Sequence, residues 1–271
     1  MRTLLILGVL VLGTLGSSTA QRPQDTPAGV PTPTSPRIQD PPADVPTYVI
    51  PRRPGPIEID GRADDEAWNA ADPIEFTFPW NDVTLEEPQT TIARLLYDDE
   101  ALYVVFECVD PYLDSQVTER DGPVYEEDSV GLFLAPNPHD TSVYFGFEMN
   151  ILGTLLDYVA YDGGEVRTPG ESIRYEWRSE GVEIETTYEG TLNDHSDIDE
   201  GWVVEARIPF HNFRHYGARI PPQPGDLWHI NLIRNAGYKG QFSLWSDTRA
   251  ERPSFHHSAW FGIASFSFRV P

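Results

Sequence analysis

The sequence is poor in cysteine and in basic residues, and both shortages exclude classes of protein. Cys108 is the only cysteine among 271 residues, so no disulfide can form within the chain. This excludes a small scaffold held together by disulfides, and a buried free thiol is the simpler interpretation. Lys and Arg together number 19 against 43 Asp and Glu, which gives a formal net charge of −24. Such a chain repels nucleic acid phosphates and anionic lipid, so we expect neutral or cationic partners and no nucleic acid.

Several catalytic and cofactor-binding motifs are also missing. No G-x-G-x-x-G and no phosphate-binding loop follows a predicted strand, so a nucleotide cofactor is not expected. The G-x-S-x-G elbow of many serine hydrolases is absent as well. His211 lies four residues before His215, and His256 adjoins His257, but neither pair has a third ligand at a spacing characteristic of zinc. We therefore interpret His211 and His215 as a surface pair on a short turn. In an extended segment His256 and His257 would point to opposite sides, so they are poorer candidates for binding one metal ion together.

The first 47 residues differ in composition from the rest. Residues 1–20 combine Arg2, an apolar run of about a dozen residues and a small-residue exit, which predicts a secretory signal peptide cleaved after Ala20. A retained membrane anchor is the alternative, although the run is short for about 30 Å of hydrocarbon. Residues 21–47 hold eight prolines among polar residues and predict a disordered linker, either a tether or a leader without its own role. We expect secretion to the extracellular space or periplasm, with no membrane contact after cleavage.

Residues 48–271 carry the pattern of an all-β domain. Short runs rich in β-branched and aromatic residues recur about every ten residues, with turn residues between them. About ten strands are predicted in this way, at 91–97, 101–109, 129–134, 143–150, 153–161, 181–192, 201–209, 227–234, 242–245 and 260–268. The first two flank Asp98-Asp99-Glu100 and read as a hairpin. Helix is scarce, with a short candidate at 63–70 and a single turn at 210–216. The pattern favours an antiparallel β-sandwich, immunoglobulin-like or jelly-roll-like, over alternating βαβ units.

Acidic residues provide candidates for catalysis and for metal binding. Glycosidases need two carboxyl groups, but adjacent acids such as Asp98 and Asp99 are expected by chance in so acidic a chain, and turns explain most of them. Glu148 differs, because it lies inside a predicted strand. Alternation places it opposite Phe147 and Met149, so it should face solvent or a concave surface. The acidic loop at 193–201 lacks the full calcium-loop pattern, although a bent loop of this kind could hold calcium.

The order of several short blocks resembles the family 9 carbohydrate-binding modules. The resemblance begins with Ile57–Trp68 (IEIDGRADDEAW), which is similar to the opening block of the family. It continues through the hairpin at 93–104, Glu127-Asp128-Ser129-Val130, Phe147-Glu148-Met149-Asn150, the strand at 202–209, Gly225–Trp228, Trp245-Ser246 and Phe261-Gly262. Each block is short, but together they cover about residues 55–268 in the family's order. The resemblance implies a sandwich that binds sugars, often beside secreted polysaccharide-degrading enzymes and frequently with structural calcium.

The resemblance also implies site residues. In the family two tryptophans clamp a terminal sugar ring while charged and amide side chains bond its hydroxyl groups. The clamp positions correspond here to Tyr125 and Phe255, and Glu148 and Asn150 match a further family block. Gly131 stands where the family usually has an acid. We therefore expect a carbohydrate-binding site formed by Tyr125, Phe255, Glu148 and Asn150, with an altered clamp and no catalytic residue.

Two functions remain open at this point. The first is a non-catalytic protein that binds poly- or oligosaccharide and supports polysaccharide breakdown. The second is a glycoside hydrolase, or a subunit of one, which uses exposed acids on the same scaffold. A weaker third hypothesis is haem binding through Met149, the only methionine besides Met1, although alternation turns Met149 toward the core.

Overall fold

The computed structural model describes residues 44–81, 88–161, 163 and 173–268. The predicted signal peptide and all but the last residues of the predicted linker lie outside these ranges. In the described part of the chain the secondary structure is strands and short 3-10 turns, without an α-helix. None of its helical segments is long and apolar enough to cross a membrane.

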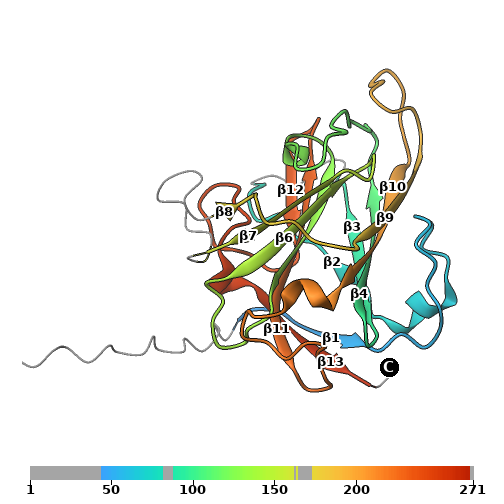
Figure 1. The fold of residues 1–271 in the computed structure, drawn as a ribbon. Helices are drawn as coiled ribbons and strands as arrows, with labels where there is room; N and C mark the ends of the chain where they lie inside the picture. Colours follow the sequence, from blue (N-terminus) through green and yellow to red (C-terminus); the bar gives the residue numbers. More distant parts are fainter. Residues whose placement is uncertain (1–43, 82–87, 162, 164–172, 269–271) are drawn as a thin grey trace, which may run out of the picture. The chain divides into compact units, whose positions relative to one another are not determined.

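The strands form two sheets, which confirms the predicted all-β sandwich (Figure 1). One sheet has the order β1-β13-β11-β5-β6-β7-β8, with β12 paired to β11, and the other has the order β2-β3-β4-β10-β9. The strands are β1 Thr47–Pro51, β2 Ile74–Glu75, β3 Thr91–Tyr97, β4 Ala101–Val109, β5 Ser129–Ala135, β6 Tyr144–Asn150, β7 Leu155–Ala160, β8 Ile173–Arg174, β9 Glu183–Glu189, β10 Gly201–Pro209, β11 Leu227–Ala236, β12 Gln241–Leu244 and β13 Gly262–Ser267. The turns are η1 Glu66–Ala70, η2 Val124–Glu126, η4 Phe210–Phe213 and η5 Ser258–Trp260.

Period-two alternation builds the central core between the sheets. Val104 and Phe106 of β4, and Phe145 and Phe147 of β6, point into this core. Met149 lies in the same cluster and is fully buried, so it packs in the central core. Large buried aromatic side chains of this kind supply much of the apolar area that stabilises a sandwich.

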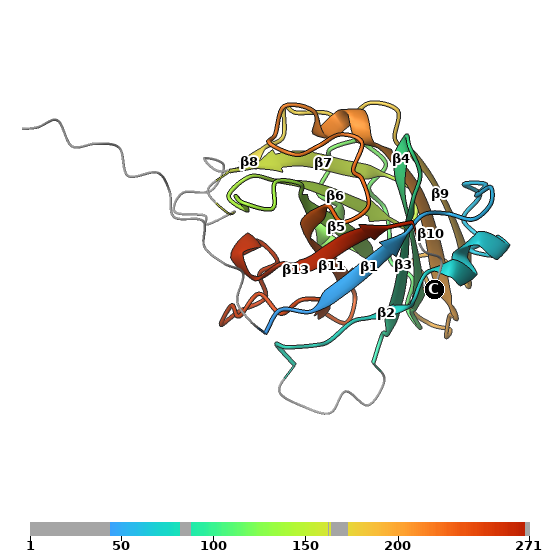
Figure 2. The same cartoon turned by 90° about the horizontal axis from the view of Figure 1, so that it is seen from below.

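Both sheets are covered on their outer faces as well, which explains why β4, β5 and β6 read as almost continuous apolar runs. The segment that carries η1 lies on the outside of the five-stranded sheet (Figure 2). Its Trp68 belongs to one cluster with Tyr103 and Val105 of β4. Glu205 anchors this segment, because its buried carboxylate accepts a hydrogen bond from Trp68 Nε1 at 2.8 Å. A second aromatic cluster, described below, covers the outside of the eight-stranded sheet.

The structure revises several details of the sequence prediction. The expected strands are present within a few residues, and β1, β2 and β8 were not predicted. Since Thr47 opens β1, the folded domain begins slightly before residue 48. β1 pairs parallel to β13, so the sheet is not purely antiparallel. The helix expected at 63–70 is the 3-10 turn Glu66–Ala70, and the turn predicted at 210–216 is η4.

Candidate functional site

The two predicted clamp rings flank the outer face of the eight-stranded sheet. Tyr125 lies in η2, directly before β5, and 47% of its surface is exposed. Its neighbour Val124 is fully buried and fixes the turn to the sheet. Phe255, on the loop between β12 and β13, is half-buried and meets the ring of Trp80 edge-on, with 5.5 Å between centroids. Both segments border the same hydrophobic cluster, so the fold brings the two clamp positions to one face.

Between these segments the sheet carries a layer of aromatic side chains, here called the outer aromatic cluster. Its rings are Phe133, Tyr144, Tyr158 and Phe261. Phe133 is 5.7 Å from Tyr144 and 6.1 Å from Phe261, measured between ring centroids. His256 stacks on Phe133 at 5.4 Å, and its Nδ1 lies 2.6 Å from the hydroxyl of Tyr144. This face is therefore packed with rings, and the polar atoms among them are hydrogen-bonded to one another.

Glu148 lies beneath this cluster, which corrects the expectation that it faces solvent or a concave surface. Alternation did place it on the outer face, but only 4% of it is exposed because the outer aromatic cluster covers it. The hydroxyl of Tyr158 donates a hydrogen bond to its Oε1 at 2.9 Å. Burial raises the pKa of Glu148 to about 7, and this bond opposes the rise.

Gly131, which stands where the family usually has an acid, has no room for a side chain. Gly131 pairs with Glu148 on one side and with Ile233 on the other. A Cβ at Gly131 would lie 2.8 Å from Cγ1 of Ile233 and 3.2 Å from Cγ of Glu148. The space that a side chain would need at residue 131 is thus already filled by its two neighbours, and only glycine fits without rearrangement.

The hydrogen bonds of Asn150 indicate that it supports the structure of its neighbours. It is fully buried, and its amide nitrogen donates to the carbonyl of Val117 at 2.8 Å and to Oε1 of Glu127 at 2.6 Å. Its amide oxygen accepts a hydrogen bond from the backbone N–H of Thr154 at 2.8 Å. Glu127 follows Tyr125 by two residues, so Asn150 supports the turn that presents Tyr125 and has no polar atom directed to the surface.

In the acidic loop at 193–201 the oxygens of Asp199 and Asn193 accept hydrogen bonds from the backbone. Asp199 is buried and accepts backbone hydrogen bonds from Thr191 at 2.7 Å and from Leu113 at 2.9 Å. Asn193 Oδ1 accepts another from Ser115, so these oxygens cap backbone N–H groups instead of converging on one point. Within the described ranges no group of three or more His, Cys, Asp or Glu side chains is arranged to hold a metal ion.

The interior holds an ion pair that sequence reasoning missed. Arg234, 1% exposed at its side chain, pairs with the fully buried Asp110, and its Nη2 lies 3.9 Å from Oδ1 of Asp128. The guanidinium also lies 4.8 Å from the ring of Trp202. Spacing along the chain could not reveal this pair, because its partners are 124 residues apart.

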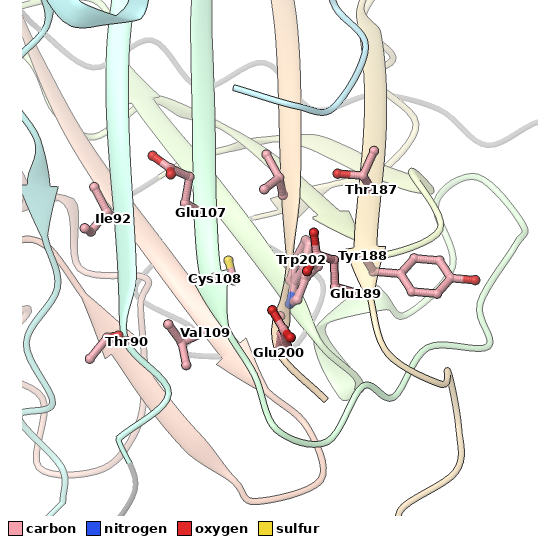
Figure 3. A pocket seen from close by; sticks show the side chains of 12 residues that line it. Thr90, Ile92, Glu107, Cys108, Val109, Thr187, Tyr188, Glu189, Glu200 and Trp202 are labelled. Atoms are coloured by element: carbon pink, nitrogen blue, oxygen red, sulfur yellow. The ribbon is translucent and has the colours of Figure 1, made fainter. Parts of the chain in front are cut away.

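A groove of about 320 Å³ crosses the outside of the five-stranded sheet near the ends of β4 and β10 (Figure 3). Glu107, Glu189 and Glu200 give it an acidic lining, while the ring of Tyr188 points away from it. Cys108 lies at its base, and burial raises the pKa of this thiol to about 11, so it is unreactive at neutral pH. None of the predicted clamp residues lines this groove.

Comparisons with known proteins agree with the resemblance seen in the sequence. A family model described as carbohydrate family 9 binding domain-like matches residues 59–267. Endo-1,4-beta-xylanase A of Thermotoga neapolitana is 38% identical over 193 residues, which are 70% of this chain and 15% of the relative. The Thermotoga maritima enzyme of the same name is 27% identical with the same coverage. The chain thus spans about 15% of the length of the curated relatives that it matches.

Solved structures share the fold at low sequence identity. A protein from Bacteroides uniformis, described as a candidate carbohydrate-binding protein, aligns with a TM-score of 0.65 at 18% identity, over 82% of this chain and all of that one. A family 9 carbohydrate-binding module from Caldicellulosiruptor kristjanssonii, in complex with cellotriose, aligns with a TM-score of 0.52 at 20% identity, over 82% and 94% of the two chains. Its glucose complex gives 0.51 at 21%, over 82% and 96%.

Proposed function

The chain belongs to the carbohydrate family 9 binding domain-like family, and from this premise we propose that it is a secreted, non-catalytic protein that binds poly- or oligosaccharide through ring stacking and polar contacts. The ligands of the Caldicellulosiruptor module, cellotriose and glucose, support neutral β-linked glucans as the first candidates. Both curated relatives are named endo-1,4-beta-xylanase A, which makes xylan a further candidate ligand. On this proposal the protein supports the breakdown of such polymers by other enzymes.

The observation that carries the proposal is the presentation of Tyr125. Nearly half of the surface of Tyr125 is exposed, while Val124 directly before it and Glu127 two residues after it are buried. The Glu127 carboxylate accepts hydrogen bonds from Ser115 Oγ at 2.8 Å and from the backbone N–H of Gln116 at 2.7 Å. An exposed ring on so firmly held a turn loses little conformational entropy when a sugar stacks on it.

The environment of Glu148 favours binding over hydrolysis. A glycosidase needs two carboxyl groups flanking the scissile bond. The pKa of Glu148 is raised by burial and lowered by its bond to Tyr158, and no other carboxylate of the described residues shifts it. A single carboxyl under a layer of rings has neither the partner nor the access to substrate that hydrolysis requires.

Affinity electrophoresis in gels that contain soluble xylan, mixed-linkage β-glucan or hydroxyethylcellulose tests the proposal. We expect at least one polymer to retard the wild-type protein. Tyr125→Ala should weaken binding about tenfold, since loss of one stacking contact costs about 1 kcal/mol or slightly more. Tyr188→Ala is the matched control, because Tyr188 is 45% exposed on the other sheet.

Three outcomes would contradict the proposal or a part of it. Wild-type mobility that no polymer changes would refute sugar binding. Equal retardation of wild type and Tyr125→Ala would refute the assignment of the ring. Release of reducing sugar from the same polymers by the wild type, and its loss in Glu148→Gln, would support the hydrolase instead.

A further inference from the structure

A cavity of about 240 Å³ is lined by residues just before β1 and by the segment between β12 and β13, and its lining combines two tryptophans with a guanidinium and two carboxylates. It is here called the tryptophan cavity. Its lining includes Trp245, Trp260, Arg249, Asp44, Asp247 and Ser246. None of the four residues predicted to bind carbohydrate belongs to this set.

Both tryptophan rings are half-buried and held in place by their surroundings. The six-membered ring of Trp245 stands over Gly262, where a Cβ would come within 2.3 Å of it. Trp245 also meets Tyr48 edge-on, with 6.3 Å between centroids. Trp260 lies in η5 and has the Arg249 guanidinium 5.4 Å from its ring centre. The cavity therefore has aromatic walls whose positions are set before any ligand arrives.

Arg249 is positioned by an unusual backbone conformation. Its φ of +59° lies in the left-handed region, which a residue with a side chain adopts at a cost. Asp247 holds this conformation, because its Oδ1 accepts the backbone N–H of Arg249 at 2.8 Å. The guanidinium Nη2 then donates to Asp44 Oδ2 at 2.7 Å, and Nη1 lies 3.7 Å from Asp247 Oδ2. One of the five guanidinium N–H groups makes the hydrogen bond to Asp44, so with respect to the described residues donors remain beside carboxylate acceptors.

Hydrogen bonds from buried hydroxyl groups hold the loop that carries these groups. Ser246, 1% exposed, donates from Oγ to the carbonyl of Trp260 at 2.6 Å. Thr248, fully buried, donates from Oγ1 to the carbonyl of Ser254 at 2.7 Å. Trp80 Nε1 ties the neighbouring segment to the carbonyl of Ala250 at 2.8 Å. A loop braced in this way keeps its shape when a ligand binds and when one side chain of the cavity is exchanged.

We propose that the tryptophan cavity is a second saccharide site, which holds one neutral pyranose unit independently of Tyr125. The C–H groups of a pyranose face suit an indole ring, while its neighbouring hydroxyl groups suit the donors of Arg249 and the acceptors of Asp247 and Asp44. Two carboxylates against one guanidinium leave the cavity negative, and the chain carries −24 overall, so a uronic acid unit is disfavoured. The volume suits a single ring, not a longer segment of chain. A polymer engaged at both sites gains affinity through effective concentration.

The test uses affinity electrophoresis of the full chain in gels with xylan, mixed-linkage β-glucan, hydroxyethylcellulose or polygalacturonate. The proteins are wild type, Trp260→Ala, Tyr125→Ala and the double variant. We expect Trp260→Ala to weaken retardation by a neutral polymer about fivefold to tenfold, in line with the loss of one ring contact. The double variant should be retarded less than either single variant.

The two proposals fail in different ways. If Tyr125→Ala removes all retardation and Trp260→Ala removes none, the second site is refuted while the first stands. If Trp260→Ala alone weakens retardation, the second site stands and the role of Tyr125 fails. Migration of the wild type that no neutral polymer changes, or retardation by polygalacturonate only, overturns the neutral second site.

Loss of folding is separated from loss of binding by a conservative pair of variants. Arg249→Lys keeps the charge and removes the planar donor fork, and it should weaken retardation severalfold. Arg219→Lys is its control, because Arg219 is an exposed arginine whose Nη2 lies 3.6 Å from Oδ1 of Asp226 and which does not line the cavity. If Trp260→Ala melts well below wild type, equal retardation of Arg249→Lys and Arg219→Lys refutes the second site.

Discussion

The buried carboxyl of Glu148 should make folding stability depend on pH in a way that one substitution removes. Burial raises the pKa of Glu148 from 4.5 to about 7 in the folded protein, whereas the unfolded chain keeps the ordinary value. The folded state therefore binds a proton between these values that the unfolded state has released. The folding stability that Glu148 contributes by binding this proton is fully present below pH 4.5 and is lost as the pH rises through about 7.

The magnitude follows from the size of the shift. A rise of about 2.5 units corresponds to about 3 kcal/mol between the two limits, of which about 2.5 kcal/mol falls between about pH 5 and about pH 8. Glu148→Gln keeps the shape of the side chain and an acceptor for the hydroxyl of Tyr158, but it cannot ionise. The stability difference, wild type minus Glu148→Gln, should therefore be about 2.5 kcal/mol larger at the lower pH.

Urea unfolding followed by tryptophan fluorescence measures this difference in buffers spanning that range. Taking the difference between wild type and variant cancels the other titrating groups, including His256, whose pKa burial lowers to about 4. Glu126→Gln controls for the loss of one negative charge, because Glu126 is exposed in the turn η2 before β5. Parallel profiles for wild type and Glu148→Gln would refute the reasoning and show that Glu148 reaches solvent in the folded protein.

Two further substitutions test the polar groups that hold the layers together. Arg234→Met leaves Asp110 and Asp128 buried without their cation. It should lower the free energy of unfolding by about 3–5 kcal/mol at neutral pH, and by less in acid. A melting temperature within a few degrees of wild type in a thermal scan at pH 7 would contradict this. Trp68→Phe removes the hydrogen bond to Glu205, which is 1% exposed. It should cost about 1–3 kcal/mol in urea unfolding, and a loss under about 0.5 kcal/mol would argue against an anchoring role for this carboxylate.

The parts of the fold that could be predicted are those set by local pattern. The hairpin of β3 and β4 was predicted to within a residue, because two β-rich runs flank the polar residues 98–100. β2 and β8 have two residues each, which is too short for a recognisable β-rich run, and the sequence did not predict them. β1 was also missed, because proline-rich surroundings hid a strand that exists only through its pairing with β13. Pairing over more than two hundred residues leaves no local signal.

The candidate site was also predicted only where a local pattern or the family resemblance pointed to it. The family resemblance led to Tyr125 and Phe255, and the structure places Phe255, together with Val124 next to Tyr125, in one cluster. Alternation correctly assigned Glu148 to the outer face but could not show that rings from other strands cover it. The grouping of Trp245, Arg249 and Trp260 follows from a left-handed residue and a looped return of the chain, which spacing does not reveal.

By itself, the sequence determined the class of the protein: an acidic all-β domain of the family 9 type, with alternation deciding which side chains enter the central core. Those properties follow from composition and from the period of two residues per strand, which act locally. Only the tertiary structure decided what lies outside the sheets. There the outer aromatic cluster buries Glu148 and raises its pKa, and the Phe255 loop gathers two tryptophans around Arg249. Desolvation and the convergence of side chains depend on distances between segments far apart in the chain, and these exist only after folding.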